Sequence, residues 1–145
     1  MFVSPLLRNA FRFSKIYYDA QKAIEGVQDG SFVMVGGFGF CGVPMNLVNA
    51  VRLKNIQNLT IASNSCGVDG KDLKSDWGLS MLLRTRQIKR LIFSHLGENV
   101  ASQTQYFNGD IELDVCPQGT LAEKIRAGGA GIPAFYTATG VGTIV

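Results

Sequence analysis

Short apolar runs alternate along the chain with segments in which apolar residues follow helical spacing. The apolar runs predict strands, which are 32–35, 59–62, 88–93 and 134–137. The helical spacing predicts helices, which are 19–26, 47–53, 77–83 and 118–127. Gly128-Gly129 is expected to stop the last of these helices. The alternation predicts an α/β fold with a mostly parallel sheet flanked by helices, and places ligands at the carboxyl ends of the strands.

The stretch 29–44 is the one around which the rest of the chain is organised. Asp29-Gly30 is a turn dipeptide, and the apolar run 32–35 is typical of a strand that is covered on both faces. Four glycines follow within seven residues, and Pro44 suits the first position of a helix. A glycine loop that ends at a helix N-terminus can hold an anion or polarise a carbonyl oxygen.

A nicotinamide site is the first alternative for this loop, because 37–42 has the form G-x-G-x-x-G. A dinucleotide fold needs an acid at the end of the second strand, about 20 residues further on, to bind the ribose. No Asp or Glu occurs between Asp29 and Asp69. The sequence therefore disfavours NAD.

Composition and charge exclude several classes of protein. With 145 residues the chain has the size of one domain, so one core is expected. The net charge of +3 is too small to indicate a nucleic-acid partner, and no apolar run is long enough to span a membrane. Three cysteines without a C-x-x-C pair, and His95 as the only histidine, predict no metal and no disulfide framework. The cysteines are expected to be small buried hydrophobes, and His95 to be structural.

The N-terminal residues 1–18 contain Arg8, Arg12 and Lys15 at helical spacing and no acid. An amphipathic, basic and acid-free segment is typical of a mitochondrial presequence, which we place at 1–14. A plain N-terminal extension is the alternative.

Two neutral amides complete the set of candidate ligand-binding residues. Asn64 is expected at a strand end and Gln118 at a helix start, where each could bind a carboxylate without neutralising its charge. A turn role for Asn64 and an N-cap role for Gln118 are the structural alternatives. The cations at 84, 86, 89 and 90 could face phosphates, but a solvated helix end is the preferred interpretation.

The whole stretch 29–44 resembles the first signature of the family I coenzyme A transferases, and matches it at every fixed position. Further segments look like the succinyl-CoA:3-ketoacid CoA-transferase branch of that family; they are 63–69, 83–90, 97–99, 117–131 and 133–136. The sequence departs from the branch at Ser65-Cys66 and at Ala138. Polarity near an acyl pocket is therefore expected to differ.

The resemblance implies an enzyme that moves CoA from succinyl-CoA to a 3-oxoacid such as acetoacetate in the mitochondrial matrix. CoA thioesters are then substrates, and no separate cofactor is needed. The implied nucleophile is a glutamate in a Ser-Glu-Asn-Gly segment that this sequence lacks, so no catalytic residue is expected in the chain. Glu98 is also followed by an asparagine, but its context differs from that segment, and we expect it to begin a helix. We interpret 15–145 as the N-terminal part of an alpha-type domain, apparently truncated at the C-terminus, that forms a homodimer through the longer enzyme.

The resemblance also assigns roles to the glycine loop and to the two amides. The loop would stabilise acyl oxyanions or line the channel to the thioester; its candidate residues are Gly36, Gly37, Phe38, Gly39, Gly42 and Pro44. A tight turn needed only for packing is the structural alternative. Asn64 and Gln118 would bind the acid substrate. A non-catalytic chain that pairs with other subunits is the second functional hypothesis.

Overall fold

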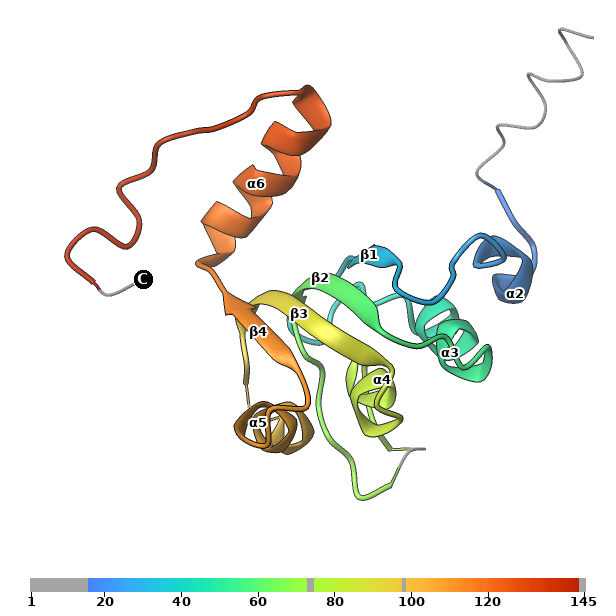
Figure 1. Cartoon of the computed structure of the whole chain (residues 1–145). Coiled ribbons are helices and arrows are strands. Elements are labelled where there is room, and N and C mark those ends of the chain that lie inside the picture. Colours follow the sequence, from blue (N-terminus) through green and yellow to red (C-terminus); the bar gives the residue numbers. More distant parts are fainter. Residues whose placement is uncertain (1–15, 73–74, 98, 144–145) are drawn as a thin grey trace, which may run out of the picture.

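Four parallel strands in the order β1-β2-β3-β4 form the centre of the fold (Figure 1). The strands are β1 (Phe32–Val35), β2 (Leu59–Ser65), β3 (Ile88–His95) and β4 (Glu112–Val115). This computed structural model describes residues 16–72, 75–97 and 99–143. The predicted presequence at 1–14 and Glu98 lie outside the described residues.

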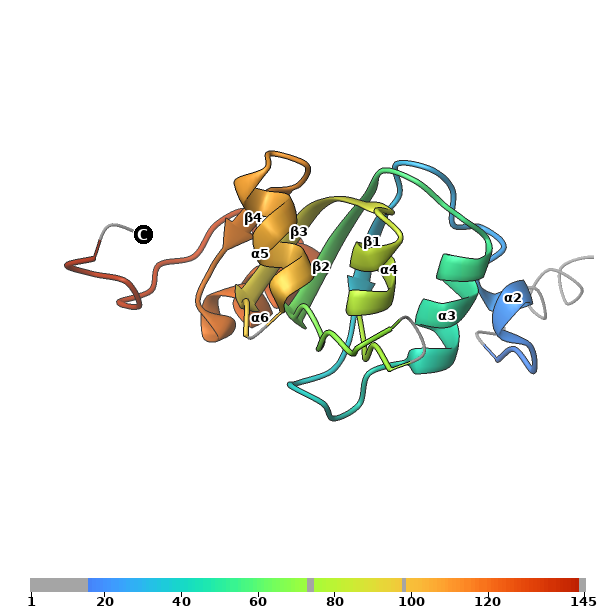
Figure 2. The same cartoon turned by 90° about the horizontal axis from the view of Figure 1, so that it is seen from below.

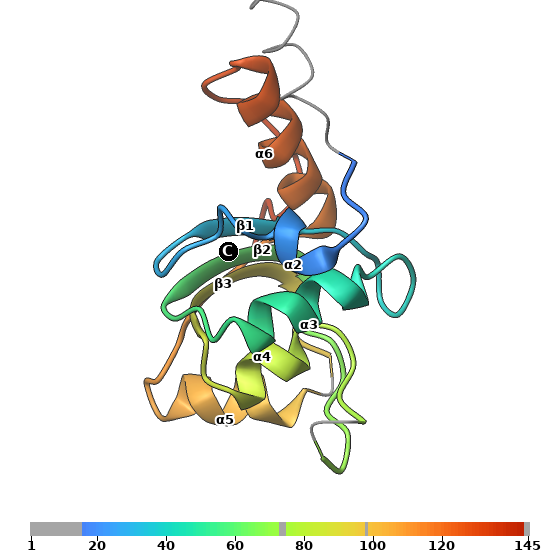
Figure 3. The same ribbon diagram turned by 90° about the vertical axis from the view of Figure 1, so that its right-hand side faces the viewer.

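Helices lie on both sides of this sheet. They are α2 (Ala20–Ala23), α3 (Met45–Leu53), α4 (Ser80–Arg84), α5 (Val100–Phe107) and α6 (Gln118–Ala130). Because the strands are in sequential order and crossovers are right-handed, the three connecting helices α3, α4 and α5 all lie on one face. Helix α6 follows β4 and lies on the other face (Figures 1 and 3).

One hydrophobic core lies between the sheet and the connecting helices, as the composition predicts. Its largest fully buried apolar side chains are Leu59, Ile61, Leu79, Leu82, Leu83, Leu91 and Phe93. In β2 and β3 the inward positions alternate along the strand, so that Ile61 and Leu91 face the core as neighbours in register. This packing fixes the strand register, and with it the place of each residue at the strand ends.

The α/β prediction is confirmed, but several elements differ from the expectation. The prediction of a strand at 134–137 is wrong, since this segment is irregular and Tyr136 is fully exposed. Apolar periodicity predicted neither β4 nor α5, although a helix start was expected at Glu98, two residues before α5. The helix expected at 77–83 is confined to Ser80–Arg84, because Trp77 pairs its backbone with Val68 instead.

The prediction that β1 is covered on both faces is also wrong. This strand lies at the edge of the sheet, and Phe32 and Met34 are 53% and 55% exposed. Their neighbours Val33 and Val35 pack against the core. One face of β1 is therefore open beside α6, and a groove of about 210 Å³ bordered by Met34 separates the two.

Gly128 and Gly129 do not stop α6, contrary to the prediction. The helix continues to Ala130 and ends at Gly131, which has φ +71° and is followed by a hydrogen bond from the Ile132 N–H to the Ala127 carbonyl. The left-handed residue at the end of a helix is usually glycine, so Gly131 provides the stop.

Replacement of the exposed Gly128 by alanine is therefore expected to stabilise the protein by about 0.5–1 kcal/mol. No atom lies within 4 Å of a Cβ added there, and the added methyl restricts the unfolded chain. Urea unfolding of Gly128→Ala measures the change. Gly131→Ala is the matched control, and should destabilise by about 1 kcal/mol because of its positive φ.

Candidate active site

The loops that follow β1 and β2 lie together at the carboxyl edge of the sheet (Figure 2). Loop 36–44 joins β1 to α3, and loop 66–79 joins β2 to α4. Parallel sheets bind their ligands at this edge. The glycine loop predicted from the sequence is therefore in the expected place.

The glycine loop is a tight reversal that only glycine can form at some positions. The Phe38 and Cys41 backbones hydrogen-bond to each other at 2.9 and 3.0 Å. Gly37 has φ +122°, and a Cβ there would lie 2.8 Å from a Val43 methyl carbon. A tight turn that is needed only for packing therefore explains the glycine at position 37. It does not explain Gly36, which has an ordinary φ and open space around it.

Some amides of this loop are already hydrogen-bonded. The Gly39 N–H donates to the Asn64 side chain at 3.3 Å, and the Phe38 N–H is used within the loop. Within the described ranges, no hydrogen bond uses the N–H of Gly37 or Gly42. These two amides remain as donors for a ligand oxygen. Pro44 is the N-cap of α3, and not its first residue as predicted.

Asn64, Ser94 and Gln118 form a cluster of neutral polar groups, which we call the amide cluster. Asn64 and Ser94 lie side by side near the ends of β2 and β3, and Gln118 is the first residue of α6. The Asn64 Nδ2 donates to Ser94 Oγ at 2.8 Å and to Gln118 Oε1 at 2.7 Å. Two amides that are 54 residues apart in the sequence are thus in contact.

The amide cluster leaves one strong donor free. Gln118 uses its Oε1 as an acceptor, also for the Ser94 hydroxyl at 2.9 Å, whereas its Nε2 has no hydrogen-bond partner in the described part of the chain. Gln118 and Asn64 border the groove between β1 and α6, together with Gly36 and Gly37. The geometry thus brings the predicted amides and part of the predicted loop to one groove. The sequence analysis did not identify Ser94 as a site residue. Only its position opposite Asn64 in the strand register distinguishes it from the other serines.

Two of the three thiols are buried, and two of the four cations predicted at 84–90 are paired on the outside of the fold. Burial raises the pKa of the Cys66 thiol to about 12 and also raises the pKa of Cys116, so both stay protonated at neutral pH. Cys41 is exposed, contrary to the expectation that all three cysteines are buried. Arg86 and Arg90 pair with aspartates on the outside of the fold, which fits the solvated interpretation. Arg84 does not fit it, because it pairs with the buried Asp76.

The described residues also show no group of three or more His, Cys, Asp or Glu side chains that could hold a metal ion. None of the helices that can be described is both long and apolar enough to cross a bilayer. Neutral hydrogen-bond donors at this edge are the Gln118 side chain and the free amides of the glycine loop. Such donors bind and orient a carboxylate or a carbonyl oxygen.

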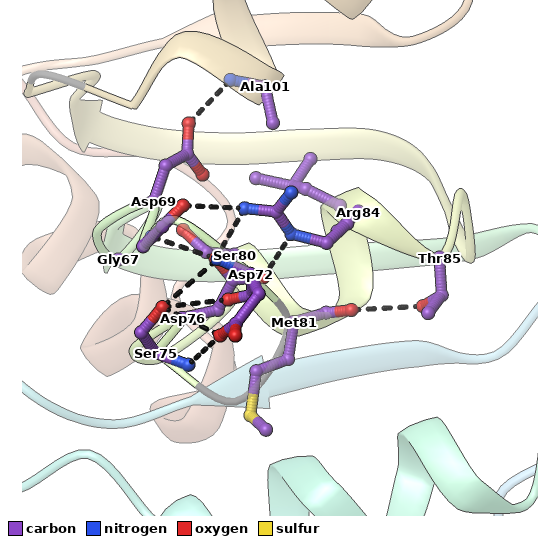
Figure 4. A network of polar contacts seen from close by, with 12 residues as sticks. Gly67, Asp69, Asp72, Ser75, Asp76, Ser80, Met81, Arg84, Thr85 and Ala101 are labelled. Carbon is purple, nitrogen blue, oxygen red and sulfur yellow. Dashed lines mark hydrogen bonds and ion pairs between the residues drawn. The ribbon is translucent and has the colours of Figure 1, made fainter.

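An ion pair between the buried Asp76 and the partly exposed Arg84 holds loop 66–79 (Figure 4). The Asp76 side chain is fully buried and accepts from Arg84 at 2.7 Å and from the Gly70 N–H at 2.8 Å. Arg84 also donates to the Gly70 carbonyl at 2.9 Å. Burial alone would raise the pKa of the Asp76 carboxyl, but the hydrogen bonds from Arg84 and Gly70 outweigh it and hold that pKa below its ordinary value.

Asp76→Asn is expected to destabilise the protein by about 2 kcal/mol at pH 7, because it removes a charged hydrogen-bonded pair that is partly exposed at Arg84. A lowered folded pKa contributes stability above the unfolded pKa, near 3.9, and this contribution is lost as pH falls through the folded pKa. The difference between variant and parent should thus shrink below about pH 4. Urea unfolding at pH 7 and pH 3 measures it. Asp110→Asn, which breaks an exposed pair, should cost less than about 0.5 kcal/mol.

Comparisons with known proteins agree with this architecture. The sequence pattern of the coenzyme A transferase family matches residues 17–145. The chain is 53% identical over 129 residues to the mitochondrial succinyl-CoA:3-ketoacid coenzyme A transferase 2A of Mus musculus, covering 89% of this chain and 24% of the mouse protein. It is 54% identical over 133 residues to one subunit of the succinyl-CoA:3-ketoacid coenzyme A transferase of Xanthomonas campestris, covering 91% of this chain and 52% of the bacterial one.

A solved structure has the same fold. The crystal structure of an acyl-CoA transferase from E. coli O157:H7, in a thioester complex with CoA, superimposes with a TM-score of 0.72 at 25% identity, covering 88% of this chain and 25% of that one. The chain therefore spans about a quarter to a half of the length of these relatives.

Proposed function

Because the chain belongs to the coenzyme A transferase family, we propose that it supplies the acid-binding part of an enzyme that moves CoA from succinyl-CoA to a 3-oxoacid such as acetoacetate. The choice of succinyl-CoA and a 3-oxoacid as substrates is supported by relatives of about 50% identity that are named succinyl-CoA:3-ketoacid coenzyme A transferases. In this proposal Gln118 binds the acid and Asn64 positions Gln118, because both Nδ2 protons of Asn64 are already donated. The amides of Gly37 and Gly42 face developing negative charge on the acyl oxygen.

The observation that carries this proposal is the free Nε2 of Gln118 beside the glycine loop. A CoA transferase must bind a carboxylate that later acts as a nucleophile. Neutral donors suit this task, because they orient the carboxylate without the strong charge neutralisation of an arginine. Asn64 positions Gln118 by donating to its Oε1 at 2.7 Å, which leaves the Nε2 for the substrate.

The reaction needs a glutamate from outside this sequence, because no Ser-Glu-Asn-Gly segment is present. Its carboxylate attacks the succinyl thioester carbonyl, the C–S bond breaks, and CoA leaves as the thiolate, which gives a mixed anhydride of glutamate and succinate. The thiolate attacks the glutamyl carbonyl and succinate leaves, which gives a glutamyl-CoA thioester. The acetoacetate carboxylate then attacks this thioester, and the released thiolate attacks the acetoacetyl carbonyl and frees the glutamate.

It follows that purified residues 1–145 should not catalyse CoA transfer by themselves. The glycine loop and the amide cluster bind acyl oxygens, but they carry no carboxylate that could form the mixed anhydride of the proposed reaction. An assay of acetoacetyl-CoA formation from succinyl-CoA and acetoacetate tests whether the chain is inactive. Steady turnover that Glu98→Gln abolishes would contradict the expectation and assign the nucleophile to Glu98.

A chimaera tests the proposed activity. Residues 17–145 replace the matching segment of the mouse transferase, to which they are 53% identical. The chimaera is expected to transfer CoA from succinyl-CoA to acetoacetate and to form a covalent CoA thioester that hydroxylamine removes. A folded chimaera that forms no acetoacetyl-CoA would overturn the proposal.

The second candidate function is a subunit-pairing module, which the open face of β1 favours. Phe32 and Met34 are about half exposed there, and exposed apolar strand edges promote association. We also propose that a longer enzyme containing this chain forms a homodimer. Size-exclusion chromatography with the mouse enzyme at micromolar concentration tests pairing, and separate elution would exclude it.

We place the protein in the mitochondrial matrix on the basic, acid-free pattern of residues 1–18. The mammalian relatives are named mitochondrial, whereas bacterial relatives have similar identity. Fusion of residues 1–18 to a fluorescent protein tests the location. A cytosolic signal would contradict it.

A further inference from the structure

Among the described residues, the lining of the groove between β1 and α6 contains no charged side chain. Its polar side chains are amides and a hydroxyl, and a primary amide has donors at one end and an acceptor at the other. The direction of the Gln118 amide therefore decides whether the groove binds an acceptor, such as a carboxylate, or a donor, such as an amine. This direction is fixed by the groups that lie behind Gln118.

The backbone of Gly39 provides the fixed starting point. A backbone N–H can only donate, and that of Gly39 donates to the Asn64 Oδ1 at 3.3 Å. The Asn64 amide is thereby oriented with its Oδ1 toward the glycine loop and its Nδ2 away from it. A reversed Asn64 amide would place two donors against each other and lose the contact with Gly39.

Asn64 transmits this orientation to Gln118. Its Nδ2 donates to the Gln118 Oε1 at 2.7 Å, so that the Oε1 faces the strand ends and the Nε2 faces away from them. The two side-chain amides are thus aligned head to tail, with their donor ends pointing away from Gly39. Hydrogen bonds that run in one direction polarise one another, which strengthens the donor at the end of the chain.

The Ser94 hydroxyl has two acceptors within reach. Its Oγ lies 2.9 Å from the Gln118 Oε1 and 2.9 Å from the Asn64 carbonyl oxygen, but a hydroxyl has only one proton to donate. When an acid accepts from the Gln118 Nε2, electron density increases on the Oε1 because the two atoms belong to one conjugated amide. The Oε1 then becomes the better acceptor for the Ser94 O–H.

We propose that Gly39 and Ser94 are positioning residues of the acid site, which together keep the donor end of the Gln118 amide toward the groove. The Gly39 N–H sets the direction of the chain, and the Ser94 O–H turns to the Gln118 Oε1 when a carboxylate binds. The inference rests on the proposed function, in which Gln118 contacts the acid. It follows that reversing one amide would change the groove from a site for acceptors into a site for donors.

Asn64→Asp reverses the chain. The aspartate keeps an oxygen for the Gly39 N–H but replaces the Nδ2 donor by a second acceptor. The Gln118 amide is then expected to turn round, so that its Nε2 donates to the new carboxylate and its Oε1 faces the groove. Acetoacetate binding should fall at least about 100-fold, whereas acetoacetamide, whose NH2 group can donate, should bind about threefold more tightly than to the parent. Repulsion between like charges explains only the first change, so unchanged or weaker acetoacetamide binding would overturn the inference.

NMR detects the direction of the chain in the free protein. A coupling across the hydrogen bond between the Asn64 Nδ2 and the Gln118 amide carbon is expected in the parent. In Asn64→Asp it should be replaced by a coupling between the Gln118 Nε2 and the new carboxylate carbon. Asn46→Asp, the same change of charge in the exposed first turn of α3, is the matched control and should keep the parent coupling. A Gln118 Nε2 that shows no such coupling in Asn64→Asp would contradict the directed chain.

Two substitutions of Ser94 test the role of its hydroxyl. Ser94→Ala removes one donor to the Gln118 Oε1 and should weaken acetoacetate binding about threefold to tenfold. Ser94→Thr keeps the hydroxyl, and a β-branched side chain suits a strand, so it should bind acetoacetate within about twofold of the parent. Parent-like binding by Ser94→Ala, or binding by Ser94→Thr as weak as that by Ser94→Ala, would exclude the positioning role.

The two proposals fail in different ways. If acetoacetate does not bind, or binds regardless of Gln118→Glu, the assignment of the acid site fails even where the couplings show a directed chain. If acetoacetate binding requires Gln118 but the coupling does not reverse in Asn64→Asp, the acid site stands and the positioning chain is excluded.

Discussion

Gln118→Glu is expected to weaken acetoacetate binding to the chain by a factor of about 100 to 1,000. The substitution removes the free Nε2 donor, and hydrogen bonds to charged groups contribute about 1.5–3 kcal/mol. It also places a negative charge beside the substrate carboxylate, and like charges about 4 Å apart near a protein surface repel by roughly 4 kcal/mol before screening by salt. Calorimetry with the chain and KM with the chimaera measure the effect.

The same substitution should leave the fold intact. Glutamate keeps the Oε1 that accepts from Asn64 and Ser94, and a negative charge is favourable in the first turn of α6. We therefore expect the free energy of unfolding to change by less than about 0.5 kcal/mol. Gln28→Glu, the same change of charge in the exposed turn before β1, is the control and should bind acetoacetate normally. Normal binding by Gln118→Glu would show that Gln118 does not contact the acid.

Gly67→Ala is expected to destabilise the protein by about 3 kcal/mol or more. Gly67 has φ +81°, and a Cβ there would lie 2.0 Å from the Trp77 carbonyl oxygen and 2.9 Å from the Leu79 nitrogen. Both are backbone atoms, so no side-chain rotation can relieve the overlap. The loop would have to separate from β2 and break the pairing of Val68 with Trp77.

Thermal unfolding measures this effect, and the midpoint should fall by roughly 10 °C for a chain of this size. Gly26→Ala is the matched control, because Gly26 has no positive φ and open space around it. Its midpoint should change by less than about 2 °C. A Gly67→Ala protein as stable as its parent would mean that loop 66–79 is not held as described.

Local pattern predicted the parts of the fold that bury apolar runs. The run at 32–35 became β1 with the same bounds, and the runs at 59 and 88 became the starts of β2 and β3. The segment 134–137 has equally strong strand propensity, but no strand in the described part of the chain pairs with it. Strand formation needs a partner, which the sequence of one segment cannot reveal.

The site was predictable in its residues and not in its contacts. Asn64 and Gln118 were expected at a strand end and a helix start, and the rule that parallel strands share one carboxyl edge accounts for their meeting. The contacts of Ser94 depend on strand register, and the carboxyl edge also depends on the fold of loop 66–79. That loop is fixed by Asp76 and Arg84, whose pairing is not visible in any spacing of residues.

Titration of the 15N-labelled chain with acetoacetate, followed by NMR, tests most directly whether this edge of the sheet binds the acid. The account predicts saturable shifts of the Gln118 side-chain amide and of the Gly37 and Gly42 backbone amides, while the Gln28 side-chain amide stays unchanged. Saturable binding that leaves the Gln118, Gly37 and Gly42 signals unmoved, or no binding at millimolar acetoacetate, would contradict it.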